Sequence, residues 1–184
     1  MCIKGLKMDY KIRTWPDPIL KEPAKEVDFF DERLQEYINK MWEFMYKEEG
    51  VGLAANQIGI PYQILVIDTS LRENRGEEET EPPVKMALIN PKIVEKEGEL
   101  QSTEGCLSFP GVRITIPRAK RVKVVGKNEK GEDVEIESSE FLAIVLQHEI
   151  DHLNGIPFIN YLSPLKRKLV LDKYLKSLKE LEKA

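Results

Sequence analysis

Two histidines and a glutamate stand close together in the C-terminal third of the chain. Residues 147–155 read Gln-His-Glu-Ile-Asp-His-Leu-Asn-Gly and contain His148 and His152, the two histidines of the sequence. On an α-helix, residues four apart fall about 40° from each other, so the two imidazoles can reach one ion. In this His-Glu-x-x-His pattern, Glu149 can take a proton from a water that a divalent metal activates. The stretch therefore predicts a metal-dependent hydrolytic site on a helix.

The pattern lacks a third protein ligand, for which the sequence offers several candidates. A metzincin-type peptidase would place a histidine six residues after the second one, but that position is Phe158. Asp172 and Glu180 belong to a regular charged-helix pattern, which counts against them as ligands. Cys106 can supply a thiolate, giving a tetrahedral site with one position left for water. We therefore expect Cys106 as the third ligand, and ligand softness leaves iron(II), zinc, nickel and cobalt open.

Other interpretations of these residues stay open at this point. A lone cysteine is commonly a small buried apolar residue. A general zinc metallopeptidase would cleave internal peptide bonds and would keep its metal after a Cys106→Ser substitution. A structural metal site would need a fourth protein ligand, and Cys2 is the candidate that remains in the sequence.

The composition indicates one soluble domain. We treat residues 1–184 as a single catalytic domain that begins with a loose N-terminal extension over residues 1–9. No run approaches the ~18 apolar residues of a membrane span, and the N-terminus lacks the apolar core of a signal peptide, so we expect a cytoplasmic protein without a membrane partner. Two cysteines cannot form a disulfide framework. The net charge of −4 argues against general nucleic-acid binding.

The spacing of apolar residues predicts three helices. Asp28 or Asp31 can cap the first helix, which ends before Gly50. The second helix, over residues 141–154, carries the two histidines and stops at Gly155. The third helix covers residues 164–184. We expect its inner side to hold Leu165, Leu169, Leu175 and Leu178, and its outer side to be basic through Lys166, Arg167, Lys168, Lys173, Lys176, Lys179 and Lys183.

Short strands are expected between the first two helices. Residues 62–68 form a buried strand, residues 84–89 and 92–97 flank a turn at Asn90-Pro91, and residues 120–127 and 133–137 form a hairpin. Residues 71–83 are polar and acidic, which is typical of a mobile loop, and residues 104–111 match neither a strand nor an ordinary loop. This order predicts a single α+β domain. Its mostly antiparallel, short-stranded sheets pack around the metal-binding helix, and a helix ends the chain.

Three stretches together resemble the signature motifs of peptide deformylases. They are Gly-Val-Gly-Leu-Ala-Ala-Asn-Gln at 50–57, Glu-Gly-Cys-Leu-Ser at 104–108 and Gln-His-Glu-Ile-Asp-His at 147–152, in the order that the family has. Trp15-Pro16-Asp17-Pro18 and Asn90-Pro91 extend the resemblance over most of the chain.

The resemblance implies removal of the N-formyl group from the initiator methionine of new polypeptides. Cys106, His148 and His152 would hold one divalent metal ion per chain, with iron(II) implied first and zinc, nickel or cobalt as alternatives. Glu149 would take a proton from the attacking water and return it to the leaving amine. The side-chain amide of Gln57 and the backbone N–H of Leu107 would stabilise the oxyanion.

The resemblance also implies where the substrate binds. The peptide backbone would pair along Gly50 to Gly52, and Arg113 would meet later residues of an N-formylmethionyl nascent peptide. Helical spacing puts three apolar residues beside the histidines, as a wall that excludes water. The methionine pocket would be lined by Val51, Gly52, Glu104, Phe141, Ile144 and Val145. The basic C-terminal helix is expected to bind the ribosome surface.

Overall fold

The computed structural model describes residues 8–72, 80–139 and 141–183. Most of the predicted N-terminal extension, and residues 73–79 of the predicted acidic loop, lie outside these ranges. Met8 is partly buried and accepts weak hydrogen bonds from the hydroxyls of Tyr10 and Tyr37. The chain is therefore already packed against the core at Met8.

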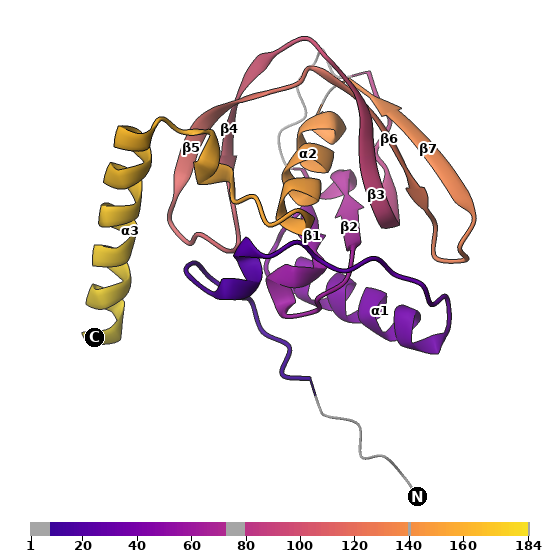
Figure 1. Ribbon diagram of the computed structural model, residues 1–184, viewed down its shortest axis with the longest axis horizontal. Coiled ribbons are helices and arrows are strands. Elements are labelled where there is room, and N and C mark those ends of the chain that lie inside the picture. The colour runs from indigo at the N-terminus through magenta and orange to yellow at the C-terminus, as the bar shows by residue number, and fades with distance from the viewer. Residues whose placement is uncertain (1–7, 73–79, 140, 184) are drawn as a thin grey trace, which may run out of the picture.

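The fold places one helix, α2 (Phe141–Leu153), between two separate antiparallel sheets (Figure 1). The five-stranded sheet has the order β1-β2-β3-β6-β7, and the two-stranded sheet pairs β4 with β5. The strands are β1 (Gly52–Ala54), β2 (Ile64–Asp68), β3 (Lys85–Glu97), β4 (Leu100–Gly105), β5 (Arg113–Arg118), β6 (Arg121–Lys127) and β7 (Asp133–Ser138). The other long helices are α1 (Glu32–Lys47) and α3 (Pro164–Lys183). The α+β prediction is confirmed.

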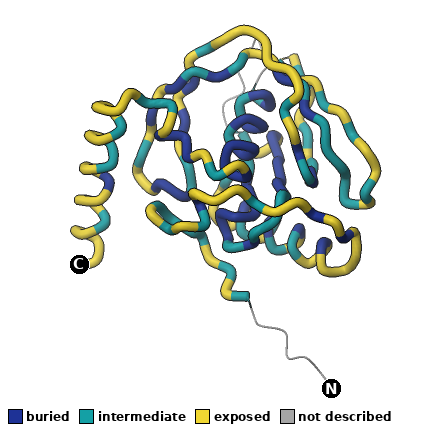
Figure 2. The backbone as a smooth tube through the Cα atoms, viewed as in Figure 1, coloured by how far each residue is buried: buried dark blue, intermediate teal, exposed yellow. Residues whose placement is uncertain are grey.

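The described core residues form three clusters, and the second of them contains the buried apolar residues of α2. One packs α1 against β1 and β2, a second packs α2 against the five-stranded sheet, and a third lies between the β4–β5 hairpin, the 3-10 segment Phe158–Tyr161 and α3. Figure 2 shows α2 as a largely buried segment in the middle of the molecule. Burial of apolar side chains in these clusters is the main favourable contribution to the free energy of folding.

Several predicted elements are confirmed with their local chemistry. The carboxylate of Asp31 accepts a hydrogen bond from the backbone N–H of Arg33, so Asp31 is the cap that begins α1. The hairpin of β6 and β7 pairs in register from Val122 with Ser138 to Lys127 with Asp133.

The predicted turn at Asn90-Pro91 is wrong, because β3 runs through it as one strand. Asn90 adopts a left-handed conformation, with φ of 51°, and the register against β6 shifts at this point. Its side-chain amide bonds both the N–H and the carbonyl of Val27, each at 2.8 Å. The polar residue therefore makes a bulge that connects the strand to the N-terminal segment, and the chain does not reverse.

The β4–β5 hairpin was not predicted, and the inward side of β4 explains why. This side holds Ser102 and Glu104, which are both buried, where an ordinary half-buried strand would have apolar residues. Alternation of apolar and polar residues is the signal that identifies such a strand. A strand that directs polar side chains inward gives no such signal.

The predicted inner side of α3 is also wrong in part. Tyr174 is buried, and Val170, Leu171 and Leu178 pack beside it, whereas Leu165, Leu169 and Leu175 are 69%, 61% and 39% exposed. The aromatic residue and its neighbours face the hairpin, so these three leucines are left exposed to solvent. Among the described residues, no helix is long and apolar enough to cross a membrane.

We expect Gly155→Ala to destabilise the protein more than Gly111→Ala. Both glycines have positive φ, 70° and 76°, which for alanine costs about 1–2 kcal/mol. A Cβ at position 155 would also lie 2.7 Å from the carbonyl oxygen of Lys21, whereas one at position 111 would meet nothing within 4 Å. This overpacking adds about 1–3 kcal/mol. Urea unfolding measures both variants, and equal losses of free energy would contradict the steric explanation.

Candidate active site

The structure brings the three predicted metal ligands together. His148 and His152 lie one turn apart on α2, and Cys106 follows directly on β4. His152 Nε2 lies 3.2 Å from Cys106 Sγ and 3.2 Å from His148 Nε2, and the three ligand atoms are all within 4.8 Å of one another. A tetrahedral ion with metal–nitrogen bonds of about 2.1 Å would separate two imidazole nitrogens by roughly 3.4 Å. The donor set therefore fits one divalent ion.

The surroundings of the histidines favour metal binding through their Nε2 atoms. His148 Nδ1 lies 2.7 Å from Glu104 Oε2, so Nδ1–H donates to this carboxylate and Nε2 is the nitrogen left for a metal. Burial lowers the pKa of His148, but hydrogen bonds with Cys106 and Glu104 outweigh it and raise this pKa well above its usual value, so metal binding there would release a proton. Burial, with His148 as a further cause, lowers the pKa of His152 well below its usual value, which keeps this ring neutral. Neutral imidazoles are the form that binds metals.

Glu149 is a buried carboxylate beside the ligands. Its side chain is largely shielded from water, and its Oε2 atom has no hydrogen-bond partner among the described residues. Burial raises the pKa of Glu149 to about 7. A Cβ at Gly52 would lie 2.8 Å from Glu149 Oε1, so only glycine leaves room for this carboxylate. The side chain has a free oxygen and a pKa suited to exchanging protons near neutrality.

The amide of Gln57 is held in one orientation. Its Oε1 accepts a hydrogen bond of 2.9 Å from the backbone N–H of Ala54, so the NH₂ end must point the other way. Nε2 then donates to Ser108 Oγ at 3.1 Å and lies 3.7 Å from Cys106 Sγ. Ser108, which the sequence reasoning did not single out, thus helps to direct a donor toward the metal ligands.

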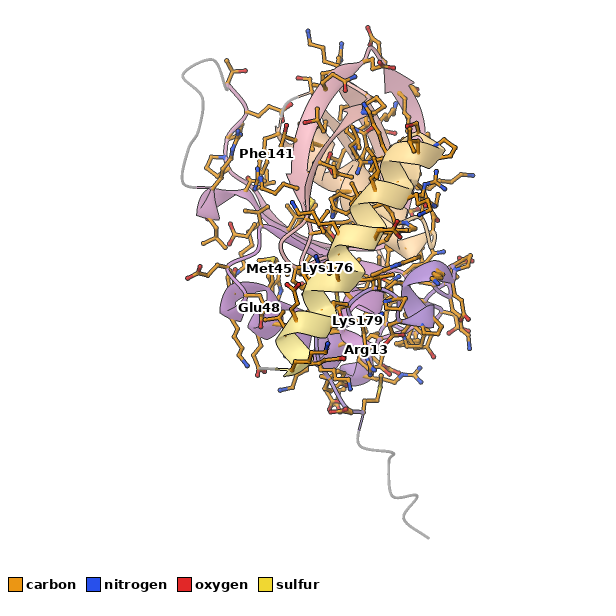
Figure 3. The ribbon with its side chains drawn as sticks, turned by 90° about the vertical axis from the view of Figure 1, so that its left-hand side faces the viewer. Arg13, Met45, Glu48, Phe141, Lys176 and Lys179 are labelled. Carbon is orange, nitrogen blue, oxygen red and sulfur yellow. The ribbon has the colours of Figure 1, made fainter. Side chains whose placement is uncertain are left out.

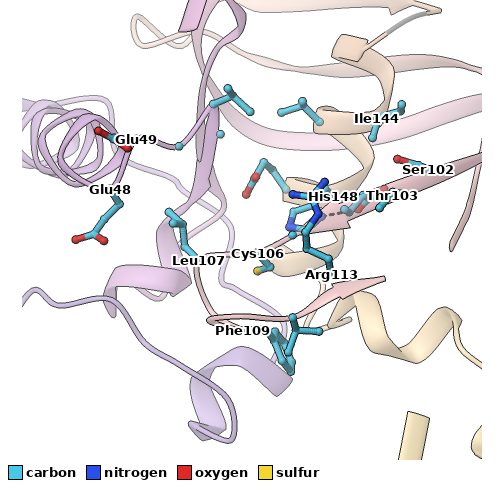
Figure 4. A pocket seen from close by; sticks show the side chains of 18 of the residues that line it. Glu48, Glu49, Ser102, Thr103, Cys106, Leu107, Phe109, Arg113, Ile144 and His148 are labelled. Atoms are coloured by element: carbon cyan, nitrogen blue, oxygen red, sulfur yellow. Dashed lines mark hydrogen bonds and ion pairs between the residues drawn. The ribbon is translucent and has the colours of Figure 1, made fainter. Parts of the chain in front are cut away.

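A cavity of about 1000 Å³ opens beside these residues (Figure 4). His152 is not among its lining residues and is 2% exposed. The other residues predicted for the site all line the cavity: Gly50, Val51, Gly52, Gln57, Glu104, Cys106, Leu107, Arg113, Phe141, Ile144, Val145, His148 and Glu149. Phe141, Ile144 and Val145 make one wall of it from α2, as their helical spacing predicted.

The environment of Glu104 differs from a simple methionine pocket. Its two carboxylate oxygens accept hydrogen bonds from Arg118 Nε and Nη2 at 2.8 and 2.9 Å, and one of them also faces His148. Burial alone would raise the pKa of Glu104, but the hydrogen bonds from Arg118 and His148 outweigh it and lower this pKa to about 2. Glu104 therefore stays ionised and supports the ring of His148.

The sequence reasoning missed Arg118, Asp151 and Tyr161, which surround Glu104. Arg118 is 3% exposed and bonds both Glu104 and Asp151, and the hydroxyl of Tyr161 donates to Asp151. Nothing in a chain with 28 basic residues marks one arginine as buried. Only the placement of Glu104 on the inner side of β4 could have indicated that a cation must lie nearby.

Comparison with known proteins gives the family to which this site belongs. Residues 9–168 match the family model described as polypeptide deformylase. The chain belongs to the peptide deformylase family. A peptide deformylase of Aquifex aeolicus is 48% identical over 168 residues, which are 91% of this chain and 96% of the relative. One of Acidobacterium capsulatum is 45% identical over 90% of this chain and 93% of the relative.

Solved structures of peptide deformylases share the fold. The structure from Legionella pneumophila has a TM-score of 0.82 at 42% identity, covering 94% of this chain and 96% of the other. A structure from Ehrlichia chaffeensis in complex with actinonin has a TM-score of 0.82 at 37% identity, covering 91% and 96%. Peptide deformylases are metal-dependent hydrolases that act on formylated nascent peptides, so the enzyme prediction is confirmed. A general zinc metallopeptidase is not favoured.

We expect Cys106→Ser to lose the metal that the wild type holds. A serine hydroxyl stays protonated near neutral pH and is a poor ligand for a soft divalent ion. Elemental analysis after dialysis against a chelator should find one ion per chain in the wild type and far less in the variant. Cys2→Ser, which removes the other thiol, serves as the control. Equal metal content in Cys106→Ser and the wild type would contradict the ligand set.

Proposed function

We propose that this chain hydrolyses the formamide bond at the N-terminal methionine of nascent polypeptides and releases formate. The observation that carries the proposal is the position of Glu149, a buried carboxylate with a free oxygen beside three convergent ligand atoms and an apolar cavity. The metal would be held by Cys106, His148 and His152. We propose iron(II), with zinc, nickel and cobalt as alternatives. When bound, the ion supplies Lewis-acid activation of water and of the formyl carbonyl.

Glu149 would move the proton of the reaction. In this proposal its carboxylate accepts a proton from the attacking water and later gives it to the leaving amine. Its burial supports this role, because a carboxyl group in an apolar setting binds a proton at a pH where an exposed one does not. The absence of a side chain at Gly52 leaves the space that this carboxylate uses.

Gln57 and Leu107 would stabilise the negative charge that develops on the formyl oxygen. The fixed orientation of the Gln57 amide supports this role, because its NH₂ group points to the side of Cys106 without any rearrangement. Leu107 follows Cys106 directly and lines the same cavity, so its backbone N–H would act beside the amide of Gln57.

The cavity would bind the methionine side chain and the start of the peptide. Phe141, Ile144 and Val145 give the apolar wall, and the edge at Gly50 to Gly52 would pair with the peptide backbone. Arg113, at the start of β5, would contact residues after methionine. A cytoplasmic location, where such chains emerge, is part of this proposal.

The basic side of α3 would hold the enzyme near its substrate on the ribosome. Lys176 and Lys179 lie along this helix (Figure 3), and both are exposed. Lysines bind the phosphates of RNA through charge, with little dependence on sequence.

The function is tested by formate release from formyl-Met-Ala-Ser under anaerobic conditions, which protect a thiolate-bound iron(II) site from oxidation. The wild type should release formate, and Glu149→Ala at equal metal content should lose about 10²-fold or more of kcat/KM. Glu97→Ala, which removes an exposed carboxylate on β3, should behave as the wild type. Full activity in Glu149→Ala would refute the mechanism, and no formate from the wild type would refute the function.

The docking proposal is tested with charge reversals. Truncating α3 would remove Tyr174 from the core, so we choose the double variant Lys176→Glu/Lys179→Glu. It should cosediment with ribosomes less than the wild type, and raising the salt concentration should reduce the difference. Lys92→Glu/Lys96→Glu, at exposed positions of β3, makes the same change in net charge. Equal binding by the two double variants would reject α3 as the docking site.

A further inference from the structure

A continuous chain of hydrogen bonds connects Tyr161 to the metal ligand His148. The hydroxyl of Tyr161 donates to Asp151 Oδ2 at 2.8 Å, and Arg118 Nη1 donates to the same oxygen. Arg118 also makes two bonds to Glu104, whose Oε2 lies 2.7 Å from His148 Nδ1. Tyr161 ends the 3-10 segment that precedes α3, so the chain of bonds joins the C-terminal region to the site.

The two buried carboxylates in this chain of bonds need more donors than Arg118 alone supplies. Two carboxylates, Glu104 and Asp151, share the guanidinium of Arg118, and the three side chains are 6%, 10% and 1% exposed. Buried charges need partners for all their hydrogen-bonding positions, because water is excluded. The hydroxyl of Tyr161 supplies Asp151 with a second donor, and the ring of His148 does the same for Glu104.

Tyr161 is well suited to be a permanent donor. Burial raises its pKa to about 12, so the hydroxyl keeps its proton over the whole physiological range. The guanidinium of Arg118 also lies over its ring, 4.8 Å from the centroid. Tyr161 therefore contacts both Asp151 and Arg118, and it limits where this guanidinium can sit.

We propose that Tyr161 is a positioning residue for His148, acting through Asp151, Arg118 and Glu104, and that it sets how slowly the site releases its metal. The inference rests on the proposed metal site. Without the hydroxyl, Asp151 loses one of its two side-chain donors and draws the other, the guanidinium of Arg118, toward itself. The carboxylate of Glu104, held by two bonds to that guanidinium, then moves away from His148 Nδ1. The imidazole loses the contact that fixes its orientation.

The test compares Tyr161→Phe with Tyr46→Phe in the full chain loaded with zinc. Tyr46 is a matched control, because its hydroxyl also donates to a buried aspartate, Asp68 Oδ2 at 2.9 Å, and it does not line the cavity. Release of zinc to a coloured chelator should be about 10-fold faster in Tyr161→Phe, the low end of what the loss of a ligand's supporting contact gives. Tyr46→Phe should release zinc at the wild-type rate. Of these two variants, only Tyr161→Phe should change the visible absorption of the cobalt(II) form.

A second variant protects the test against a general loss of stability. Asp151→Asn keeps the shape of the side chain but weakens its hold on Arg118 and Tyr161, so it should also speed zinc release. A wild-type release rate in Tyr161→Phe would overturn the proposal, as would equal acceleration in Tyr161→Phe and Tyr46→Phe. Zinc release needs no formylated substrate, so a failure here is distinguishable from a failure of the proposed reaction.

Discussion

The α2 helix is buried on nearly all sides, so each polar group that it carries needs a hydrogen-bond partner from another element. The surrounding elements supply these partners. Gln147 makes two hydrogen bonds to the backbone of Ala119, between β5 and β6. The carbonyl of His152 accepts a bond from Asn56, in the segment after β1. The partners thus come from parts of the chain far apart in sequence, so the position of α2 depends on several separate elements.

Glu149 and His152 depart from this rule. Glu149 Oε2 and His152 Nδ1 are buried without a hydrogen-bond partner among the described residues. Leaving such an atom unpaired costs about 1–3 kcal/mol, which stability alone would not retain. For Glu149 the unpaired oxygen lies beside the cavity, where a free acceptor is useful to a hydrolase. The cost is tolerated where the fold is stabilised by the packing of α2 on β1 and β2.

The sequence was sufficient for those parts of the site that depend on local spacing. Two histidines four apart, with a glutamate between them, predict that both imidazoles lie on one face of a helix. The same helical period predicts that Phe141, Ile144 and Val145 lie beside them. Arg118 was not predictable in this way, because its burial arises only when β5 packs against α2. The face of α3 was misassigned because leucine spacing alone does not show that Tyr174 packs against Phe109, with ring centroids 5.6 Å apart.

The separation of the two sheets has a consequence for how the protein would lose its activity over time. Cys106 lies at the end of the β4–β5 hairpin, whereas His148 and His152 lie on α2, so a bound ion would cross-link two parts that share no strand. Without that link the hairpin would be held by its core cluster, by the ion pairs of Arg118 and by the hydrogen bonds of Ser108 with Trp15 and Gln57. Local opening of the loop at Cys106 would expose the thiol to oxidants such as peroxide, and a sulfinic or sulfonic acid cannot simply be reduced back to a thiolate ligand. Metal loss and oxidation would then reinforce each other, which turns a reversible loss of metal into permanent inactivation.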